Sequence, residues 1–207
     1  MSKIYFFLIL VFFGSCSESN SSDRNSSDTN QEKYSDYQKS VLRFRDSAST
    51  MFLSGANGVL LKEDLSTTGS FHYFDPSESY RIGAELEVIE DGEVIEMKTN
   101  TERLPEYRRY GLLKFNVGTE ACQLTLYQNV EQPSYFFCPF KDMTNGKETY
   151  GAGRYLDFEF EDLKNPVIDF NLCYNPYCAY NYNYSCPIPP IENHLKIAIE
   201  AGEKKWK

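Results

Sequence analysis

The chain is poor in the residues that build common metal and nucleic-acid sites. It has two histidines, one tryptophan and 21 basic residues against 30 acidic ones, which gives a formal net charge of -9. Apart from a short cluster around Lys204, no run of basic residues is present. A surface of this sign repels phosphate backbones, so we expect no nucleic-acid partner. The cysteines lack the paired CxxC spacing that marks zinc sites, and we expect no metal and no other cofactor.

The chain also lacks an apolar run long enough to span a membrane, and its longest apolar run belongs to an N-terminal leader. Residues 1–15 contain one basic residue, Lys3, then an apolar run over residues 4–13 and two small residues before Cys16. A spanning helix needs about 20 apolar residues, so this segment is typical of a secretory signal peptide. Its end, Phe13-Gly14-Ser15-Cys16, resembles the lipobox of bacterial lipoproteins, which implies that Cys16 is lipidated. The alternative is an ordinary signal peptide with a chance cysteine.

The segment after Cys16 predicts a tether. Residues 17–33 contain no apolar residue and are rich in Ser, Asn and Asp, a composition typical of disordered chain. In bacterial lipoproteins, an aspartate directly after the lipidated cysteine acts as a signal that keeps the protein out of the outer membrane. This chain has Ser17 at that position. The resemblance therefore implies an outer-membrane protein, facing the periplasm or the cell surface, whose membrane contact is a lipid anchor only.

The remaining length fits one domain. A chain of 207 residues with 41% hydrophobic and 15% aromatic residues can bury a core once the leader and tether are set aside. We therefore predict a signal peptide at 1–15, a disordered tether at 16–34, one β-rich domain at 35–204 and a tail at 205–207.

Periodicity predicts one helix followed by strands. Ser35 and Gln38 have the spacing of a capping box, and apolar residues then recur every three or four positions, so we expect a helix from Asp36 to about Met51. From residue 71 the period is two. No helical crossover separates the strands, which excludes a parallel sheet. The predicted fold class is mostly β: an antiparallel β-barrel or sandwich of about eight strands with one N-terminal helix.

The strands themselves are bounded by turn signals. Asp91-Gly92 predicts a two-residue hairpin turn that places Leu86 opposite Met97 and Val88 opposite Ile95. Further strands are expected at 109–117, 122–128, 135–140, 155–161, 167–171 and 195–201.

Four stretches of the C-terminal half resemble a known family. They are FKDMTNGKETYGAGRYLDFEF, DFNLCYNPYCAY, SCPIPPIENHL and the closing AGEK. These motifs resemble the bacterial domain of unknown function 1684 family, and the resemblance extends from the helix around Arg43 to Lys204. It implies a fold and a set of characteristic residues, but no known chemistry. Cys173 lies where the resemblance leads us to expect a small residue.

The cysteines near the C-terminus allow three interpretations. Cys178 and Cys186 match the family motif and enclose a short loop of Tyr and Asn, so in an exported chain we expect them to form a disulfide. A metal set of Cys173, Cys178, Cys186 and His194 is a second possibility, although its spacings match no zinc pattern. The third makes Cys178 a nucleophile with His194 as its base.

The polar residues of the same motifs form the candidate site. Convergent polar groups at the mouth of a small β-domain are typical of a ligand pocket, and the same groups are equally suited to a structural network. Arg154 in particular can form an ion pair, with Asp169 or Glu203 as the expected partner. Tyrosines of the loop, between Tyr174 and Tyr184, can stack on a sugar or aromatic ligand or cover a core edge. The candidate ligand-binding or network residues are Arg154, Asp169, Asn171, Asn175 and Asn193.

Together these features predict a lipid-anchored cell-envelope protein with a ligand-binding or structural β-domain, and no catalytic residue is assigned. Its partner would be a small molecule or an envelope component. The alternative is an envelope hydrolase or thiol-dependent enzyme that uses Cys178, and an assembly protein without a ligand is the third class.

Overall fold

The computed structural model describes residues 33–55, 58–65 and 71–206 of the chain. All but the first of these residues belong to the second of two units into which the chain divides, Tyr34–Lys207. Cys16, the expected signal peptide and all of the expected tether except Lys33 and Tyr34 lie outside the described residues. Within the described part of the chain, no helix has the length and apolar character needed to cross a membrane.

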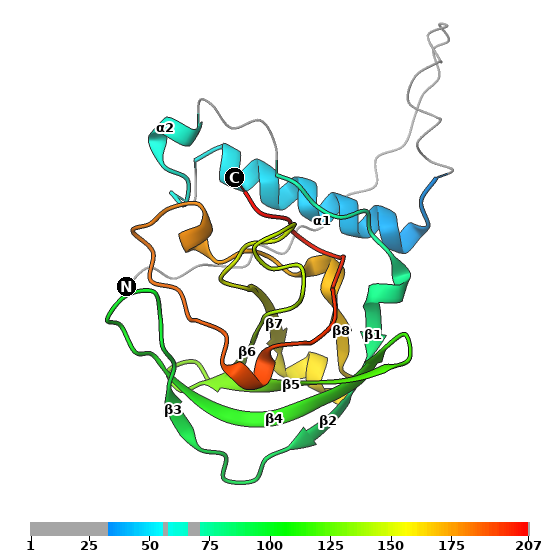
Figure 1. Cartoon of the computed structure of the whole chain (residues 1–207), viewed down its shortest axis with the longest axis vertical. Coiled ribbons are helices and arrows are strands. Elements are labelled where there is room, and N and C mark those ends of the chain that lie inside the picture. The colour runs from blue at the N-terminus through cyan, green and yellow to red at the C-terminus, as the bar shows by residue number, and fades with distance from the viewer. Residues whose placement is uncertain (1–32, 56–57, 66–70, 207) are drawn as a thin grey trace, which may run out of the picture. The chain divides into compact units, whose positions relative to one another are not determined.

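Helix α1 spans Asp36–Leu53, which confirms the predicted helix (Figure 1). The capping box forms as the sequence indicates: Ser35 Oγ accepts from the N–H of Gln38, and Gln38 Oε1 accepts from the N–H of Ser35. Val41 and Arg45 are the buried residues of the helix. They lie four positions apart and therefore on one face, which turns toward the rest of the domain. A single further turn, α2, covers Lys62–Leu65.

The main sheet is antiparallel and has six strands. Its order is β2-β4-β5-β6-β7, and β3 pairs with β4 beside β2. The strands are β2 (Glu85–Val88), β3 (Val94–Glu96), β4 (Glu106–Val117), β5 (Glu120–Asn129), β6 (Tyr135–Phe140) and β7 (Arg154–Glu159).

The predicted hairpin at Asp91-Gly92 is wrong. β2 and β3 do not pair with each other; they bind one after the other along the same edge of β4, with Val88 opposite Gly111 and Val94 opposite Arg108. The residues between them form a bulge in this edge. A Cβ on Gly92 would lie 1.9 Å from the Arg109 carbonyl oxygen, so glycine is needed there because the backbone of β4 passes so close.

A second, two-stranded sheet pairs β1 (Arg81–Gly83) with β8 (Val167–Asp169). Between the two sheets lies the main core, in which alternate residues of β4 to β7 meet the fully buried Ile168 and Phe170. Figure 1 shows the main sheet beneath the loops and helix α1. The predicted fold class, mostly β and antiparallel with one substantial helix, is confirmed. The main sheet stays open, so the sandwich fits and the barrel does not.

The strand predicted at 195–201 does not form. The segment makes two backbone bonds to the chain after β6, from Leu195 N–H to Lys141 O (2.8 Å) and from Met143 N–H to Ile197 O (2.9 Å). Its carbonyls at Ile199 and Ala201 accept from the guanidinium of Arg154. A side chain thus takes the place of a neighbouring strand, while the apolar residues of the segment still reach the core.

Short 3-10 turns connect the remaining segments. They are η1 (Glu78–Tyr80), η2 (Phe160–Lys164), η3 (Phe170–Leu172), η4 (Tyr177–Ala179) and η5 (Ile191–Asn193). The stretch from β8 to residue 193 is therefore a chain of turns, which agrees with its content of proline and asparagine.

Candidate functional site

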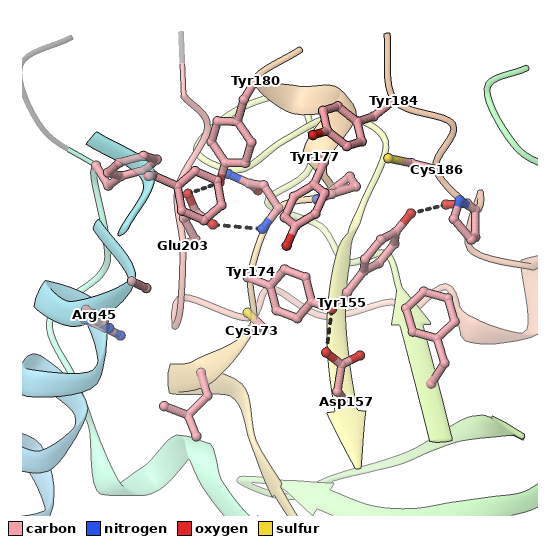
Figure 2. A pocket seen from close by; sticks show the side chains of 18 of the residues that line it. Arg45, Tyr155, Asp157, Cys173, Tyr174, Tyr177, Tyr180, Tyr184, Cys186 and Glu203 are labelled. Carbon is pink, nitrogen blue, oxygen red and sulfur yellow. Dashed lines mark hydrogen bonds between the residues drawn. The ribbon is translucent and has the colours of Figure 1, made fainter. Parts of the chain in front are cut away.

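The main pocket of the described residues has a volume of about 490 Å³. It lies between α1, the sheet face at β6 and β7, the tyrosine-rich segment 171–187 and the C-terminal segment at Glu203 (Figure 2). Of the 26 residues that line it, 12 are phenylalanine or tyrosine, and four carry a charge: Arg45, Arg103, Asp157 and Glu203. The pocket therefore offers a broad apolar surface with a few fixed polar groups, as small-molecule sites do.

Strand alternation explains how one sheet supplies both a core and a pocket wall. In β6, Phe136 and Cys138 enter the main core, whereas Phe137 lies on the opposite face and lines the pocket. In β7, Leu156 enters the core, while Tyr155 and Asp157 line the pocket. Period-two alternation thus sends Phe137, Tyr155 and Asp157 to the pocket side.

Asp157 is held in the pocket by two phenols. Tyr135 Oη donates to Asp157 Oδ1 and Tyr174 Oη donates to Oδ2, each at 2.6 Å. The carboxylate remains accessible to solvent through the pocket, although protein surrounds most of it. Burial raises the pKa of Asp157 above its usual value, and the two phenol bonds oppose this effect. Burial and the nearby carboxylate also raise the pKa of Tyr135 and of Tyr174.

Glu203 is a second pocket carboxyl, and its side chain is deeply buried. Tyr180 Oη donates to Oε1, and the backbone N–H of Asn175 donates to Oε2 at 2.8 Å. Burial raises the pKa of Glu203 to about 7, while the bonds from Tyr180 and Asn175 act in the opposite direction. The carboxyl of Glu203 therefore changes its protonation state near neutral pH.

Arg45 brings a buried guanidinium to the helix side of the pocket. It is 4% exposed, donates to the carbonyls of Phe74 (2.7 Å) and Asn171 (2.9 Å), and lies 4.7 Å from the ring centroid of Tyr73. Its Nε has no hydrogen-bond acceptor. Burial lowers the pKa of Arg45. The cation is thus stabilised by carbonyl dipoles and an aromatic face, and no described carboxylate forms an ion pair with it.

Arg154 lies in the interior between β7 and the C-terminal segment. Its Nη2 makes a 2.8 Å ion pair with Asp142, and both side chains are completely buried. Nη2 also donates to the Ile199 carbonyl, and Nη1 donates to the carbonyls of Ala201 and Glu203, while the buried Nε has no acceptor. The guanidinium is therefore an internal crosslink, and its carboxylate partner is Asp142, not Asp169 or the side chain of Glu203.

The other predicted site residues occupy three different places. Asn193 joins β5 to β6: its Oδ1 accepts from Thr125 N–H at 2.7 Å, and its Nδ2 donates to the carbonyls of Thr125 and Pro139. Asp169 and Asn171 bind each other and the hydroxyl of Tyr37 on α1.

Asn175 lines the pocket, donates to the Lys204 carbonyl, and has a buried Oδ1 without a partner. The five predicted residues thus do not share one cavity. Only Asn171 and Asn175 are among those lining the pocket.

Cys178 and Cys186 lie next to each other as thiols. The backbone N–H of Cys178 donates to Cys186 Sγ at 3.2 Å, and all five described cysteines are free. A hydrogen bond with Cys186 lowers the pKa of Cys178 to about 7. His194 Nε2 lies 3.1 Å from the Pro189 carbonyl oxygen. Among the described residues no group of three or more His, Cys, Asp or Glu side chains is arranged to hold a metal.

Sequence reasoning did not single out Arg45 or Asp157 as site residues, and gave Glu203 only an ion-pairing role. Each carried a signal. Arg45 lies four positions after Val41, on the buried stripe of the helix, where an arginine requires a special partner. Asp157 alternates with the core residues Leu156 and Phe158 and therefore shares the opposite face with Tyr155. Glu203 stands in the AGEK motif, after Gly202, whose φ of 74° and contact with Cys173 require glycine.

Comparisons with known proteins agree with this architecture. The solution NMR structure of an uncharacterized protein from Haloarcula marismortui is similar over 86% of this chain and 97% of the archaeal chain, with 31% identity and a TM-score of 0.64. No curated protein matches. The model of one family matches residues 69–204, which include the whole main sheet, the tyrosine-rich segment and Glu203. The chain therefore belongs to the family described as protein of unknown function (DUF1684).

Proposed function

We propose that this protein is a lipid-anchored protein of the outer membrane whose domain binds a small molecule in the aromatic pocket. The observation that carries the binding role is the pocket itself, about 490 Å³ in volume and lined by 12 aromatic residues. Ligand sites of proteins commonly measure 300–1,000 Å³ and combine apolar walls with a few fixed polar groups. Here those groups include Asp157 and Glu203, each held in place by two hydrogen bonds.

The single tryptophan provides an assay for binding. The ring of Trp206 lies 4.8 Å from Phe71 and 5.4 Å from Tyr180, and both of these residues line the pocket. Ligands that displace either ring will change the fluorescence of Trp206. We expect members of a panel of small aromatic and amphipathic compounds to change this fluorescence in a saturable way and to raise the thermal midpoint of the purified protein.

A matched pair of variants tests whether binding occurs in the pocket. Ala48 on α1 lines the pocket, and the neighbouring Ser47 is exposed and does not. Ala48→Phe fills part of the cavity and should abolish the response, whereas Ser47→Phe adds the same ring outside it and should not. A panel without any saturable response, or equal binding by both variants, would contradict the proposed binding role.

The proposed anchor rests on the leader and its resemblance to a lipobox at Cys16. In cells fed a labelled fatty acid, the wild-type chain should take up label and fractionate with the outer membrane. Cys16→Ser should lose the label and leave the membrane fraction. A wild-type chain that is soluble and unlabelled would refute the anchor without affecting the pocket.

A thiol-dependent enzyme centred on Cys178 is the second candidate, because the pKa of this thiol is lowered to about 7. Against it, Cys178 is not among the residues that line the pocket, and His194 bonds the Pro189 carbonyl. For an exported chain we favour a disulfide between Cys178 and Cys186. The folded protein should then resist alkylation at both positions until it is reduced; free alkylation without reductant would exclude the disulfide.

A further inference from the structure

Asp157 is a pocket carboxylate without a cationic partner. Its two oxygens accept from Tyr135 and Tyr174, and no lysine or arginine among the described residues forms an ion pair with it. Arg103, which lines the same pocket, donates instead to Ser185 Oγ at 3.1 Å and to the Ser185 carbonyl at 2.9 Å. The protein groups that bind the carboxylate of Asp157 are therefore two neutral phenols, and its exposed part faces solvent.

At the helix side of the pocket, a cationic and an acidic residue, Arg45 and Glu203, lie near the same tyrosine. Arg45 lies over the ring of Tyr73, and the backbone of Tyr73 pairs with that of Glu203. A cation and a carboxyl thus lie on the same side of the pocket, each adjoining Tyr73. Asp157 on β7 is not part of this arrangement, and no described cation pairs with it.

The ring of Tyr155 stands nearly at right angles to two other rings beside Asp157. Tyr155 meets Phe137 at 80° with a centroid distance of 4.7 Å, and it meets Tyr174 at 88° and 5.8 Å. The hydroxyl of Tyr155 donates to the carbonyl of Pro187, which fixes the ring (Figure 2). All three rings line the pocket. They form a packed corner beside the carboxylate, in which Phe137 and Tyr155 are buried and Tyr174 is partly exposed.

A cation is the ligand group that both features attract. Aromatic faces carry the negative part of the ring quadrupole, and they bind alkylammonium groups, which combine a positive charge with an apolar surface. A hard metal ion needs several oxygen ligands, whereas this corner supplies one carboxylate and apolar ring faces. A neutral or anionic group would leave Asp157 uncompensated in a largely apolar site.

We propose that the ligand carries an alkylammonium group, which binds against Asp157 in the corner formed by Phe137, Tyr155 and Tyr174. This inference rests on the proposed binding function of the pocket and adds the chemical class of its ligand. The carboxylate supplies the opposite charge, and the rings contact the alkyl groups around the nitrogen. The net charge of -9 also favours approach of a cation.

Two probes of the same shape separate charge from volume. Choline carries a trimethylammonium group, and 3,3-dimethyl-1-butanol is its uncharged isostere. In calorimetric titrations of the purified full-length chain, choline should bind about tenfold more tightly than the alcohol. Asp157→Asn keeps the size of the side chain and an acceptor oxygen for a phenol. It should abolish the preference for choline while changing the affinity for the alcohol less than about twofold.

A control and a second variant keep the test independent of folding. Glu159→Gln removes an exposed charge two residues further along β7, outside the pocket, and should retain the preference. Tyr155→Leu removes a ring face without changing charge and should weaken choline binding more than alcohol binding. The thermal midpoint of each variant reports whether it is folded.

The possible failures are distinguishable. Equal binding of choline and the alcohol, or a preference that survives Asp157→Asn, overturns the cationic ligand. If uncharged aromatic compounds still bind in that case, the pocket remains a binding site of another specificity. If neither probe binds and the aromatic panel also gives no response, the inference and the proposed function fail together.

Discussion

Replacing Glu203 by glutamine should make the protein less stable than wild type at low pH and more stable than wild type at high pH. Burial raises the pKa of this carboxyl from 4.5 to about 7 in the folded state. The folded protein therefore holds the proton up to a higher pH than the unfolded chain does. Between pH 4.5 and 7 the folded state binds more protons, so the free energy of unfolding falls as pH rises. Above pH 7 the full cost of the buried charge is present.

The magnitude follows from the two pKa values. The interval from 4.5 to about 7, at about 1.4 kcal/mol for each pH unit, corresponds to a loss of about 3 kcal/mol. Glutamine is neutral throughout, so Glu203→Gln removes this loss. It retains only one acceptor for the donors from Tyr180 and Asn175, at a cost of about 1 kcal/mol at every pH. The variant should be less stable than wild type by about 1 kcal/mol at pH 4 and more stable by about 2 kcal/mol at pH 8.5.

Urea unfolding at a series of pH values, followed by the fluorescence of Trp206, measures these free energies. Glu120→Gln, which removes an exposed carboxylate at the start of β5, is the control and should follow the wild-type curve. A difference between Glu203→Gln and wild type that stays constant from pH 4 to pH 8.5 would refute the assignment of a raised pKa to Glu203.

Three further predictions concern the fold and the thiols. Gly92→Ala should destabilise the protein by about 1–3 kcal/mol in urea unfolding, because its Cβ would lie 1.9 Å from a backbone oxygen. Gly83→Ala is the control and should be neutral, since its Cβ meets nothing within 4 Å. Equal effects of the two substitutions would contradict the close contact at Gly92. Asn193→Ala should cost about 3 kcal/mol, since it leaves buried groups of two strands unpaired, and a loss below about 1 kcal/mol would contradict the crosslink. In the reduced protein, alkylation of Cys178 should show a midpoint near pH 7, and Cys186→Ala should raise it, because the hydrogen bond that lowers the pKa is lost; an unchanged midpoint would disprove that cause.

Local patterns predicted the elements that depend on neighbouring residues. The capping box at Ser35 and the stripe through Val41 gave the helix, and alternation gave β6 at its observed bounds. The predicted hairpin between β2 and β3 was wrong because glycine is needed both in a tight turn and where another backbone segment passes close by. Gly92 serves the second purpose, and the strand that passes it lies beyond the reach of a local pattern.

The site was harder to predict because it is assembled from distant parts of the chain. The sequence analysis offers two roles for the tyrosines of the loop, a ligand surface or a core edge, and Tyr174, Tyr177, Tyr180 and Tyr184 line the pocket. The charged residues of the pocket come from α1, the segment before β4, β7 and the C-terminal segment, and their proximity is a product of the fold. Arg154 shows the same difficulty: its partner Asp142 lies only 12 positions away, but the ion pair depends on the turn between β6 and β7.

The interrupted edge of the main sheet bears on how copies of this protein behave when they are crowded. A straight, uncharged edge strand invites the strand of another copy, which is a route to aggregation. Here the outer strand is broken by the bulge at Gly92, and the segment from Glu85 to Glu96 carries six acidic side chains and no basic one. At the opposite edge, the backbone of Tyr174 forms hydrogen bonds with the backbone of Tyr155 in β7. Neither edge of the main sheet therefore presents a long, regular template, so concentrating the protein should favour mutual repulsion over growth of a shared sheet.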